Sequence, residues 1–437
     1  MNVRLATGVA LAACLVLASC GGGSKKTPLP GTRISVLELE KTLTPDPKLE
    51  ATPIALPSPF DNPAWPDAGG YSNHAMYHLA LAPDINRAWK TDVGEGTWRY
   101  GRITAQPIVA GDRVFAADAN DVVSAFDVKS GDRIWRFDPQ PKDADAPMFG
   151  GGIAYADGRI FIATGYAQVV AVDAATGKEI WRQSLASPAH GPPTAAAGRV
   201  FAITVDNELE TLAASDGRRL WTHNGLPEPT DLLIGASPAV QGDTVIVPYS
   251  SGELYALRVA NGRPVWSDNL ATSRPLGALS SLADIRGQPV IDRDRVFAIS
   301  HSGILVAIDL RTGDRVWEQD IGGTHMPWVA GDYIYVLAND RDLVCLLRSD
   351  GHVRWVRPLP RYEDEEAKKG ALRWSGPVLA GNRLVVISSD GEAFSISPYT
   401  GQPLGQVKFS DGVFLDPAVA GATLYVITDE AELVALR

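Results

Sequence analysis

The chain has 437 residues, of which 45% are apolar and 21% charged, with 42 glycines and 31 prolines. This balance suits a large, turn-rich β fold or two to three smaller domains. The formal net charge of −11 argues against nucleic acid or anionic lipid headgroups as partners attracted by the surface as a whole.

The first residues have the pattern of a bacterial export signal. Arg4 precedes an apolar stretch that is too short to span a bilayer, because a membrane helix needs about 20 residues. The stretch ends in "LASC", which resembles the lipobox of bacterial lipoproteins. We therefore expect a signal peptide at residues 1–19 and lipidation of Cys20, and the Gly21 that follows implies sorting to the outer membrane. An uncleaved anchor or an ordinary cleavage site is the alternative.

Two further segments precede the regular part of the chain. Residues 20–30 begin with the lipidated cysteine and continue as the Gly-, Ser- and Pro-containing run "GGGSKKTPLP", which is typical of a flexible tether. Residues 31–84 form an N-terminal extension, whose Trp65 and Tyr71 we expect to pack on the domain that follows.

Two histidines in the extension have the spacing of metal ligands. His74 and His78 are four residues apart, so on a helix they would face the same way. Since "YSNHAMYHLA" offers no clear acidic third ligand, a packing or solvent role is favoured and no metal is predicted.

From residue 85 onward one phrase returns along the chain. A turn with glycine is followed, four residues after the glycine, by tryptophan, as in "VDAATGKEIW" and "IDLRTGDRVW". Successive copies are 38 to 51 residues apart, close to the period of a four-stranded propeller blade. A last copy has Gly405 in place of the tryptophan. The repeat tryptophans, which we expect to be structural rather than ligand-stacking, are Trp89, Trp135, Trp181, Trp221, Trp266, Trp317 and Trp355.

A second phrase sets the number of blades. A polar turn before a β-rich run, as in "ADGRIFIA" and "AGDYIYVL", occurs eight times, and the eighth copy has no Trp phrase after it. Trp89, in contrast, has no such phrase ahead of it. We therefore predict an all-β fold, an eight-bladed β-propeller over residues 85–437 with four-stranded antiparallel blades, closed by an N-terminal strand that pairs into the last blade. Closure removes exposed sheet edges.

The repeat carries a family resemblance. The pattern Ala-x-Asp-x-x-Thr-Gly-x-x-x-Trp at Ala171–Trp181 and Ala307–Trp317 resembles the tryptophan-docking repeat of quinoprotein-type eight-bladed propellers. Together with the lipobox, it is similar to the BamB family, the propeller lipoproteins of the outer-membrane β-barrel assembly machine. The resemblance implies a non-enzymatic scaffold, lipid-anchored at the periplasmic face of the outer membrane. Its implied partners are the POTRA domains of the BamA insertase, other subunits of the machine and nascent outer-membrane proteins.

The resemblance also implies where the insertase binds. In that family the contact is made by loops on one face around the fourth and fifth blades, to which residues 230–238 and 279–289 correspond. An apolar run with charge nearby is a plausible interface hot spot. The residues that the resemblance assigns to partner binding are Leu232, Leu233, Ile234, Asp284 and Arg286.

Two observations weigh against this assignment. Ile234 stands where the family pattern has an arginine, and Arg286 stands where it has an acidic residue, so any charge pairing must differ. The run Leu232–Ile234 also fits plain strand core.

The alternative function is that of a periplasmic propeller that binds a small ligand or acts as a quinone-dependent dehydrogenase. That family implies a calcium site, a catalytic aspartate and usually adjacent cysteines, and this sequence has no Cys-Cys pair. Cys345, in the apolar run "LVCLL", fits a buried inert thiol better than a reactive one.

Other motifs give no support for catalysis. "MFGGGIAYADG" lacks the lysine and the hydroxyl residue of a phosphate loop, and no Gly-x-Ser-x-Gly motif occurs. We therefore predict no catalytic residue and no cofactor. The charged run at residues 361–374 is expected to be a solvated loop or short helix rather than a docking element.

Overall fold

The computed structural model describes residues 43–49, 52–99, 101–144, 148, 150–228, 232–271 and 282–437. The predicted signal peptide, Cys20 and the tether lie outside these residues. The chain divides into a unit Met1–Leu43 and a unit Thr44–Arg437, and every described strand belongs to the second unit. Within the described ranges, no helix has the length and apolar character needed to cross a membrane.

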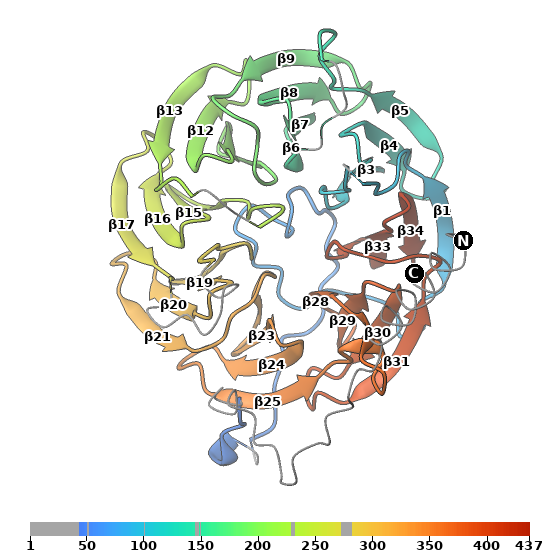
Figure 1. Cartoon of the computed structure of the whole chain (residues 1–437), viewed down its shortest axis with the longest axis vertical. Coiled ribbons are helices and arrows are strands. Elements are labelled where there is room, and N and C mark those ends of the chain that lie inside the picture. The colour runs from blue at the N-terminus through green and yellow to red at the C-terminus, as the bar shows by residue number, and fades with distance from the viewer. Residues whose placement is uncertain are drawn as a thin grey trace, which may run out of the picture. The chain divides into compact units, whose positions relative to one another are not determined.

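Eight four-stranded antiparallel sheets are arranged in a ring in the described part of this unit (Figure 1). Blade 1 consists of β2 (Ile108–Ala110), β3 (Arg113–Ala117), β4 (Val123–Asp127) and β5 (Arg133–Phe137). Blade 2 consists of β6 (Gly152–Ala156), β7 (Arg159–Thr164), β8 (Gln168–Asp173) and β9 (Glu179–Ser184). Blade 3 consists of β10 (Thr194–Ala196), β11 (Arg199–Ile203), β12 (Glu208–Ala213) and β13 (Arg219–Asn224). Blade 4 consists of β14 (Ala239–Gln241), β15 (Thr244–Pro248), β16 (Glu253–Arg258) and β17 (Pro264–Asn269).

The remaining blades follow in chain order. Blade 5 consists of β18 (Val290–Asp292), β19 (Arg295–Ile299), β20 (Leu305–Asp309) and β21 (Arg315–Gln319). Blade 6 consists of β22 (Trp328–Ala330), β23 (Tyr333–Leu337), β24 (Asp342–Leu347) and β25 (Val353–Pro358). Blade 7 consists of β28 (Trp374–Ala380), β29 (Arg383–Ser388), β30 (Glu392–Ile396) and β31 (Pro403–Lys408). Blade 8 consists of β32 (Ala418–Ala420), β33 (Thr423–Ile427), β34 (Glu432–Leu436) and β1 (Arg87–Asp92), and a short helical turn, η2 (Pro47–Leu49), precedes the ring.

The closure of the ring is as predicted. β1 pairs antiparallel with β34, with Trp89 opposite Ala435 and Asp92 opposite Glu432. The segment at the start of the repeats therefore supplies the outermost strand of blade 8. The eight-bladed, all-β fold is confirmed.

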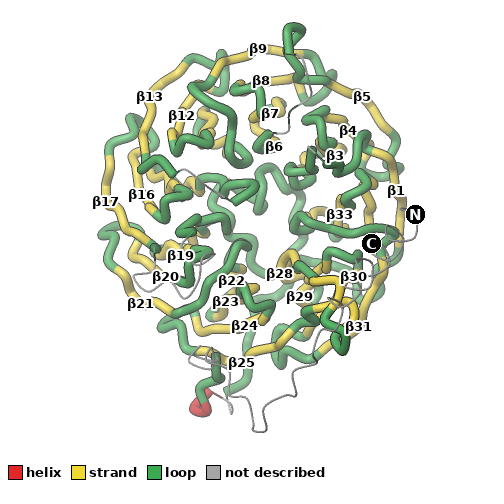
Figure 2. The backbone as a smooth tube through the Cα atoms, in the orientation of Figure 1, coloured by secondary structure: helices red, strands yellow, loops and turns green. Residues whose placement is uncertain are grey.

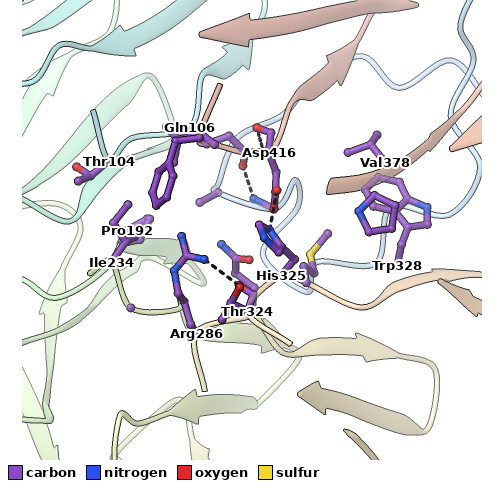
Figure 3. Close-up of a pocket in the computed structure, with 18 of the residues that line it drawn as sticks. Thr104, Gln106, Pro192, Ile234, Arg286, Thr324, His325, Trp328, Val378 and Asp416 are labelled. Carbon is purple, nitrogen blue, oxygen red and sulfur yellow. Dashed lines mark hydrogen bonds and ion pairs between the residues drawn. The ribbon is translucent and has the colours of Figure 1, made fainter. Parts of the chain in front are cut away.

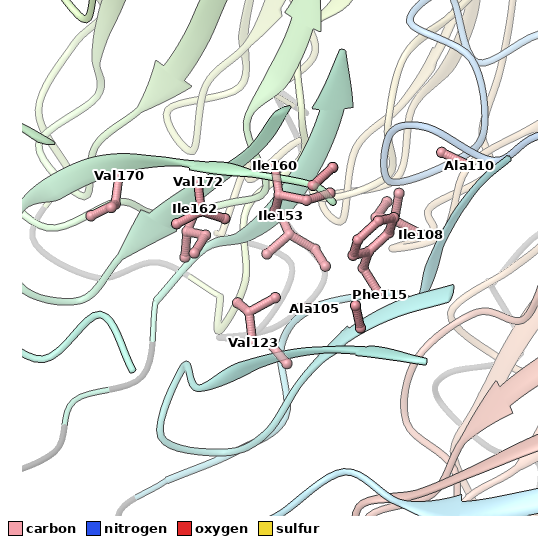
Figure 4. Packing of buried hydrophobic residues seen from close by; sticks show 13 residues of the cluster. Ala105, Ile108, Ala110, Phe115, Val123, Ile153, Ile160, Ile162, Val170 and Val172 are labelled. Atoms are coloured by element: carbon pink, nitrogen blue, oxygen red, sulfur yellow. The ribbon is translucent and has the colours of Figure 1, made fainter. Parts of the chain in front are cut away.

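The inner strands of each blade are buried on both faces because neighbouring blades pack face to face. All five residues of β15, "TVIVP", are buried, whereas the outer strand β9, "EIWRQS", has no fully buried residue. Between blades 1 and 2, Phe115 and Val123 meet Ile153, Ile160 and Val172 (Figure 4). This packing explains why the second phrase of the repeat is rich in β-branched and aromatic residues.

Each repeat tryptophan packs on the glycine turn of the next blade. The indole Nε1 of Trp135 donates to the carbonyl of Ala174 at 3.1 Å, and a Cβ on Gly177 would lie 2.7 Å from the Trp135 ring. Gly177 also has a φ of +69°, which disfavours any residue with a side chain. The same pairing recurs around the ring in Trp89–Gly131, Trp181–Gly217, Trp221–Gly262, Trp266–Gly313, Trp317–Gly351 and Trp355–Gly401.

A segment ahead of the first strand follows the inside of the ring. We call residues 57–82 the inner strap; it is the blue segment that crosses the centre of Figure 1 and the loop inside the ring in Figure 2. It contacts all eight blades near the turn between their first and second strands. The hydrogen bonds, from blade 1 to blade 8, are Trp65 N to Val109 O, Tyr155 N to Pro66 O, Ala195 N to Asp67 Oδ1, Val240 N to Ser72 O, Ile291 N to Asn73 O, Trp328 Nε1 to Tyr77 O, Gly381 N to Leu79 O, and Gly421 N to Asn62 O.

The two histidines of the strap have packing roles. His74 Nδ1 donates to the carbonyl of Pro289 at 2.7 Å, and its Nε2 lies 3.3 Å from the hydroxyl of Ser237. His78 Nδ1 donates to Pro57 O at 2.7 Å, and its Nε2 accepts the N–H of Asn382. His74 therefore joins the strap to Ser237 and Pro289, and His78 joins Pro57 of the strap to Asn382. Of the expected packing or solvent role, the structure shows packing.

One local prediction was wrong. Residues 361–374 contain a two-stranded hairpin, β26 (Tyr362–Asp364) and β27 (Lys369–Ala371), rather than a loop or helix. Its tip residues are exposed, so the charge run is solvated as expected. The chain reverses direction at residues 365–368, where Lys368 takes a left-handed backbone angle.

Candidate functional site

The two loops assigned to partner binding contact each other. Asp284 Oδ2 accepts the N–H of Leu232 at 2.9 Å, and Arg286 Nε donates to the carbonyl of Leu233 at 3.2 Å. Both loops belong to the face of the propeller that carries the links between consecutive blades, which we call the linker face. All five assigned residues are therefore brought together at one place.

The five side chains differ in what they present. Leu233 is 43% exposed, and Leu232, Ile234 and Arg286 are partly exposed. Asp284 is only 2% exposed, so its carboxylate holds the loop by accepting a backbone N–H and is not a surface charge. Ile234 has a φ of +68°, which is uncommon for a β-branched residue. The run is thus a shaped turn ahead of β14 and not strand core.

The centre of the ring beside this site is a small hollow above the inner strap (Figure 3). Trp65, Ala68 and Gly69 of the strap line it on one side, and Arg286 and His325 belong to the linker-face loops around it. Its volume is about 50 Å³, whereas sites for small molecules typically measure about 300–1,000 Å³. This hollow therefore offers no room for a fused-ring redox cofactor.

Gln106 ties this hollow to the strap. Its Oε1 accepts from Trp65 Nε1 at 3.2 Å and from the N–H of Gly69 at 2.7 Å, and its Nε2 donates to the carbonyl of Asp416 at 3.0 Å. Trp65 in turn stacks on Trp328, with ring centroids 6.5 Å apart. The Gln106 side chain therefore joins the strap to the link before blade 8, next to blade 1.

Asp416 is the acidic group of the hollow. It accepts from His325 Nδ1 at 2.9 Å and from the N–H of Gly376, and Arg286 lies near it. Burial alone would raise the pKa of this carboxyl, but the contacts with His325, Gly376 and Arg286 together outweigh burial and lower it. Asp416 is therefore ionised and engaged at neutral pH.

Cys345 is buried in β24 opposite Trp355. Burial raises the pKa of its thiol well above the usual range, which removes the thiolate that reactivity requires. The expectation that this thiol is buried is confirmed.

Sequence reasoning missed several residues of this region. Gln106, His325 and Asp416 stand singly in loops of ordinary composition, and no motif marks them. The strap has a weak signal, the cluster of aromatic and glycine residues in "PAWPDAGGY", which separates it from a flexible tether.

Comparisons with known proteins point to one family. A family model described as "Outer membrane protein assembly factor BamB" matches residues 119–357. The outer membrane protein assembly factor BamB of Yersinia pestis is 29% identical over 348 residues, which cover 78% of this chain and 86% of that protein. The BamB of Burkholderia pseudomallei is 26% identical over 357 residues, with 81% and 88% covered.

Solved structures share the fold. The crystal structure of BamB from Moraxella catarrhalis aligns with a TM-score of 0.70 at 21% identity and covers 81% of this chain and 100% of that one. The quinohemoprotein alcohol dehydrogenase of Comamonas testosteroni aligns with a TM-score of 0.63 at 14% identity and covers 86% and 80%. At these identities the likeness concerns the fold alone.

Proposed function

Because the chain belongs to the family of outer membrane protein assembly factor BamB, we propose that it is a non-enzymatic scaffold of the outer-membrane assembly machinery. It binds the POTRA region of the BamA insertase and assists the folding and insertion of β-barrel proteins. The lipidated Cys20 holds it at the periplasmic face of the outer membrane.

The observation that carries this proposal is the shaped turn on the linker face. Leu233 is exposed, while the Asp284 carboxylate and the Arg286 guanidinium fix the backbone on either side of it. An apolar side chain on a rigid turn loses little conformational freedom when it inserts into a partner. That is the property expected of an interface anchor.

The alternative, a ligand-binding or dehydrogenase propeller, finds less support. The inner strap crosses the centre of the ring, and the hollow above it measures about 50 Å³, below the usual range for small-molecule sites. The dehydrogenases that share the fold do so at low identity, which carries no inference about chemistry.

Calorimetry of the purified chain with the POTRA array of the same organism's insertase tests the proposal. We expect binding by the parent and at least a tenfold loss for Leu233→Asp, since a charge would be buried in the contact. Leu404→Asp is the matched control, because Leu404 is an exposed leucine, 60% accessible, on the outer strand β31. Absence of binding by the parent would overturn the proposed partner, and equal losses in both variants would overturn the proposed face.

A further inference from the structure

A second hollow lies on the linker face between blades 5, 6 and 7. It measures about 180 Å³ and is lined by Arg286, Arg341 and Arg373. His301, from the turn between β19 and β20, lines it as well. No aspartate or glutamate is among the described residues that line it, although the chain as a whole carries a net charge of −11.

The three arginines form no close ion pair in the described part of the chain, although Asp284 and Asp416 attract Arg286 and Asp429 attracts Arg373. Arg286 donates to the carbonyls of Leu233 and Thr324, at 3.2 and 3.3 Å, and Arg341 donates to the carbonyl of Leu372 at 2.9 Å. Within the described residues, none of the three forms an ion pair of 4.0 Å or less; Asp416, the nearby acid, is held by His325. Elsewhere in the described chain, most of the ion pairs use arginine.

Two of these arginines, Arg286 and Arg373, gather with Arg102 around one aromatic ring. The guanidinium carbons of Arg286 and Arg373 lie 5.3 and 5.7 Å from the centroid of Phe414, and that of Arg102 lies 4.2 Å from it. Like charges held this close repel one another, and the Phe414 ring and the acids Asp416 and Asp429 oppose that repulsion. An arrangement of this kind is stabilised further when an anion enters.

Part of the remaining wall is apolar, beside the polar Thr324, His325 and Asn339. Leu337, Leu372, Val413 and Trp374 line the same hollow, so an entering group meets hydrocarbon as well as guanidinium. The volume is below the range of about 300–1,000 Å³ that sites for whole small molecules typically have, and it suits a single side chain. His301 Nδ1 is buried and has no hydrogen-bond partner among the described residues, which leaves one more polar atom to be satisfied.

We propose that this hollow binds an acidic side chain, with apolar neighbours, of an extended peptide from a protein partner. The carboxylate pairs with Arg341 and Arg373, since planar guanidinium groups bind carboxylates in a bidentate manner. The methylene stem and the flanking side chain contact Phe414 and Trp374. This site goes beyond the Leu233 turn and does not require that the partner be the insertase.

Saturation-transfer NMR on peptides tests the proposal with the full chain purified in detergent. The probes are the acetylated and amidated peptides Ala-Leu-Glu-Leu-Ala and Ala-Leu-Gln-Leu-Ala, which differ by one carboxylate. We expect the Glu peptide to bind about tenfold more tightly than the Gln peptide. Equal binding of the two peptides would overturn the proposal.

Variants localise the effect. Arg341→Gln combined with Arg373→Gln should weaken binding of the Glu peptide about tenfold. Arg218→Gln should leave binding unchanged, because Arg218 is an exposed arginine in the turn before β13, on the face opposite the linker face. In Arg373→Glu, which changes an exposed side chain, preference should switch to the peptide Ala-Leu-Lys-Leu-Ala. An unchanged preference there, or an equal loss in Arg218→Gln, contradicts the site.

Competition by small anions is the last part of the experiment. If inorganic phosphate or acetate displaces the Glu peptide at or below the peptide's own concentration, the hollow is a site for small anions and the proposal fails. The peptide experiment contains no insertase, and its variants leave Leu233 and Arg286 unchanged. Its outcome therefore tests the peptide site independently of the proposed binding to the insertase.

Discussion

The outer ring of Trp–Gly contacts and the inner strap both join consecutive blades, but the sequence specifies them differently. The outer contacts repeat: each tryptophan meets a glycine turn of the next blade in the same way, as Trp181 meets Gly217. The strap meets each blade with different residues, through backbone groups at most blades, and through the Asp67 carboxylate or the Trp328 indole at others. We expect the buried anchors of the strap to contribute more stability per residue than the repeated Trp–Gly contacts.

The largest expected effect falls on a strap anchor. Trp65→Ala removes a fully buried indole that bonds to Gln106 and stacks on Trp328. We expect a loss of about 3–5 kcal/mol in the free energy of unfolding, measured by urea titration. Trp181→Ala, which truncates a partly exposed tryptophan of the outer ring, should cost less. A larger loss for Trp181→Ala would contradict the proposed difference between the strap and the outer Trp–Gly contacts.

The strap also contains a buried histidine whose protonation should destabilise the fold in acid. Burial lowers the pKa of His74 to about 4 from its ordinary value of 6.5, and the bond to Pro289 opposes this only in part. The unfolded chain therefore takes up a proton first, so stability present above pH 6.5 is lost as the pH falls towards 4. The loss is on the order of 3 kcal/mol.

The measurement of this effect is a difference between two proteins. Burial raises the pKa of Asp67 to about 8, and this shift has the opposite sign: stability falls as the pH rises from about 4 to 8. The unfolding free energy of the parent should therefore be compared with that of His74→Gln at each pH, since Asp67 contributes equally to both. If the difference between the two stays constant from pH 7 to 4, His74 is not held neutral.

A smaller effect tests the outer ring. Gly217→Ala places a methyl group 2.6 Å from the Trp181 ring at a φ of +75°, and we expect a loss of about 2 kcal/mol. Gly198→Ala in the same blade is the matched control, because Gly198 has a φ of +70° and nothing within 4 Å of the added methyl. The loss in Gly198→Ala should reflect the backbone alone. If both variants lose the same amount of stability, the Trp contact adds nothing to the glycine requirement.

The periodic ring was predictable and the strap was not. Trp89, interpreted as the missing outer strand of the last blade, predicted the closure through β1, which the structure confirms. Every strap contact is unique and joins distant parts of the chain; Asn62 and Val419 are 357 residues apart. A single copy of a contact leaves no pattern to recognise, so only its residue types gave a signal.

The candidate site was predicted in the same uneven way. Family resemblance brought Leu233 and Arg286 to one place, and the structure places them in contact. The resemblance did not indicate that Asp284 is buried. A sequence does not distinguish an aspartate that accepts a backbone N–H inside the fold from an aspartate at the surface. Phe414 and Arg373 lie in links between blades, where no repeat applies, and only the ring brings them together.

The smallest effect is expected at the seam between blades 7 and 8. Gly405 stands in β31 where the other blades carry the repeat tryptophan, and a side chain there would meet nothing within 4 Å. At the matching place in blade 8, the backbones of Asn86 and Arg437 pair by two hydrogen bonds, so no glycine turn is present to receive an indole. Gly405→Trp should therefore change the unfolding free energy by less than about 0.5 kcal/mol, as surface substitutions usually do. A gain as large as the loss in Trp181→Ala would mean that the tryptophan alone joins two blades, and that the glycine turn is not a necessary half of the contact.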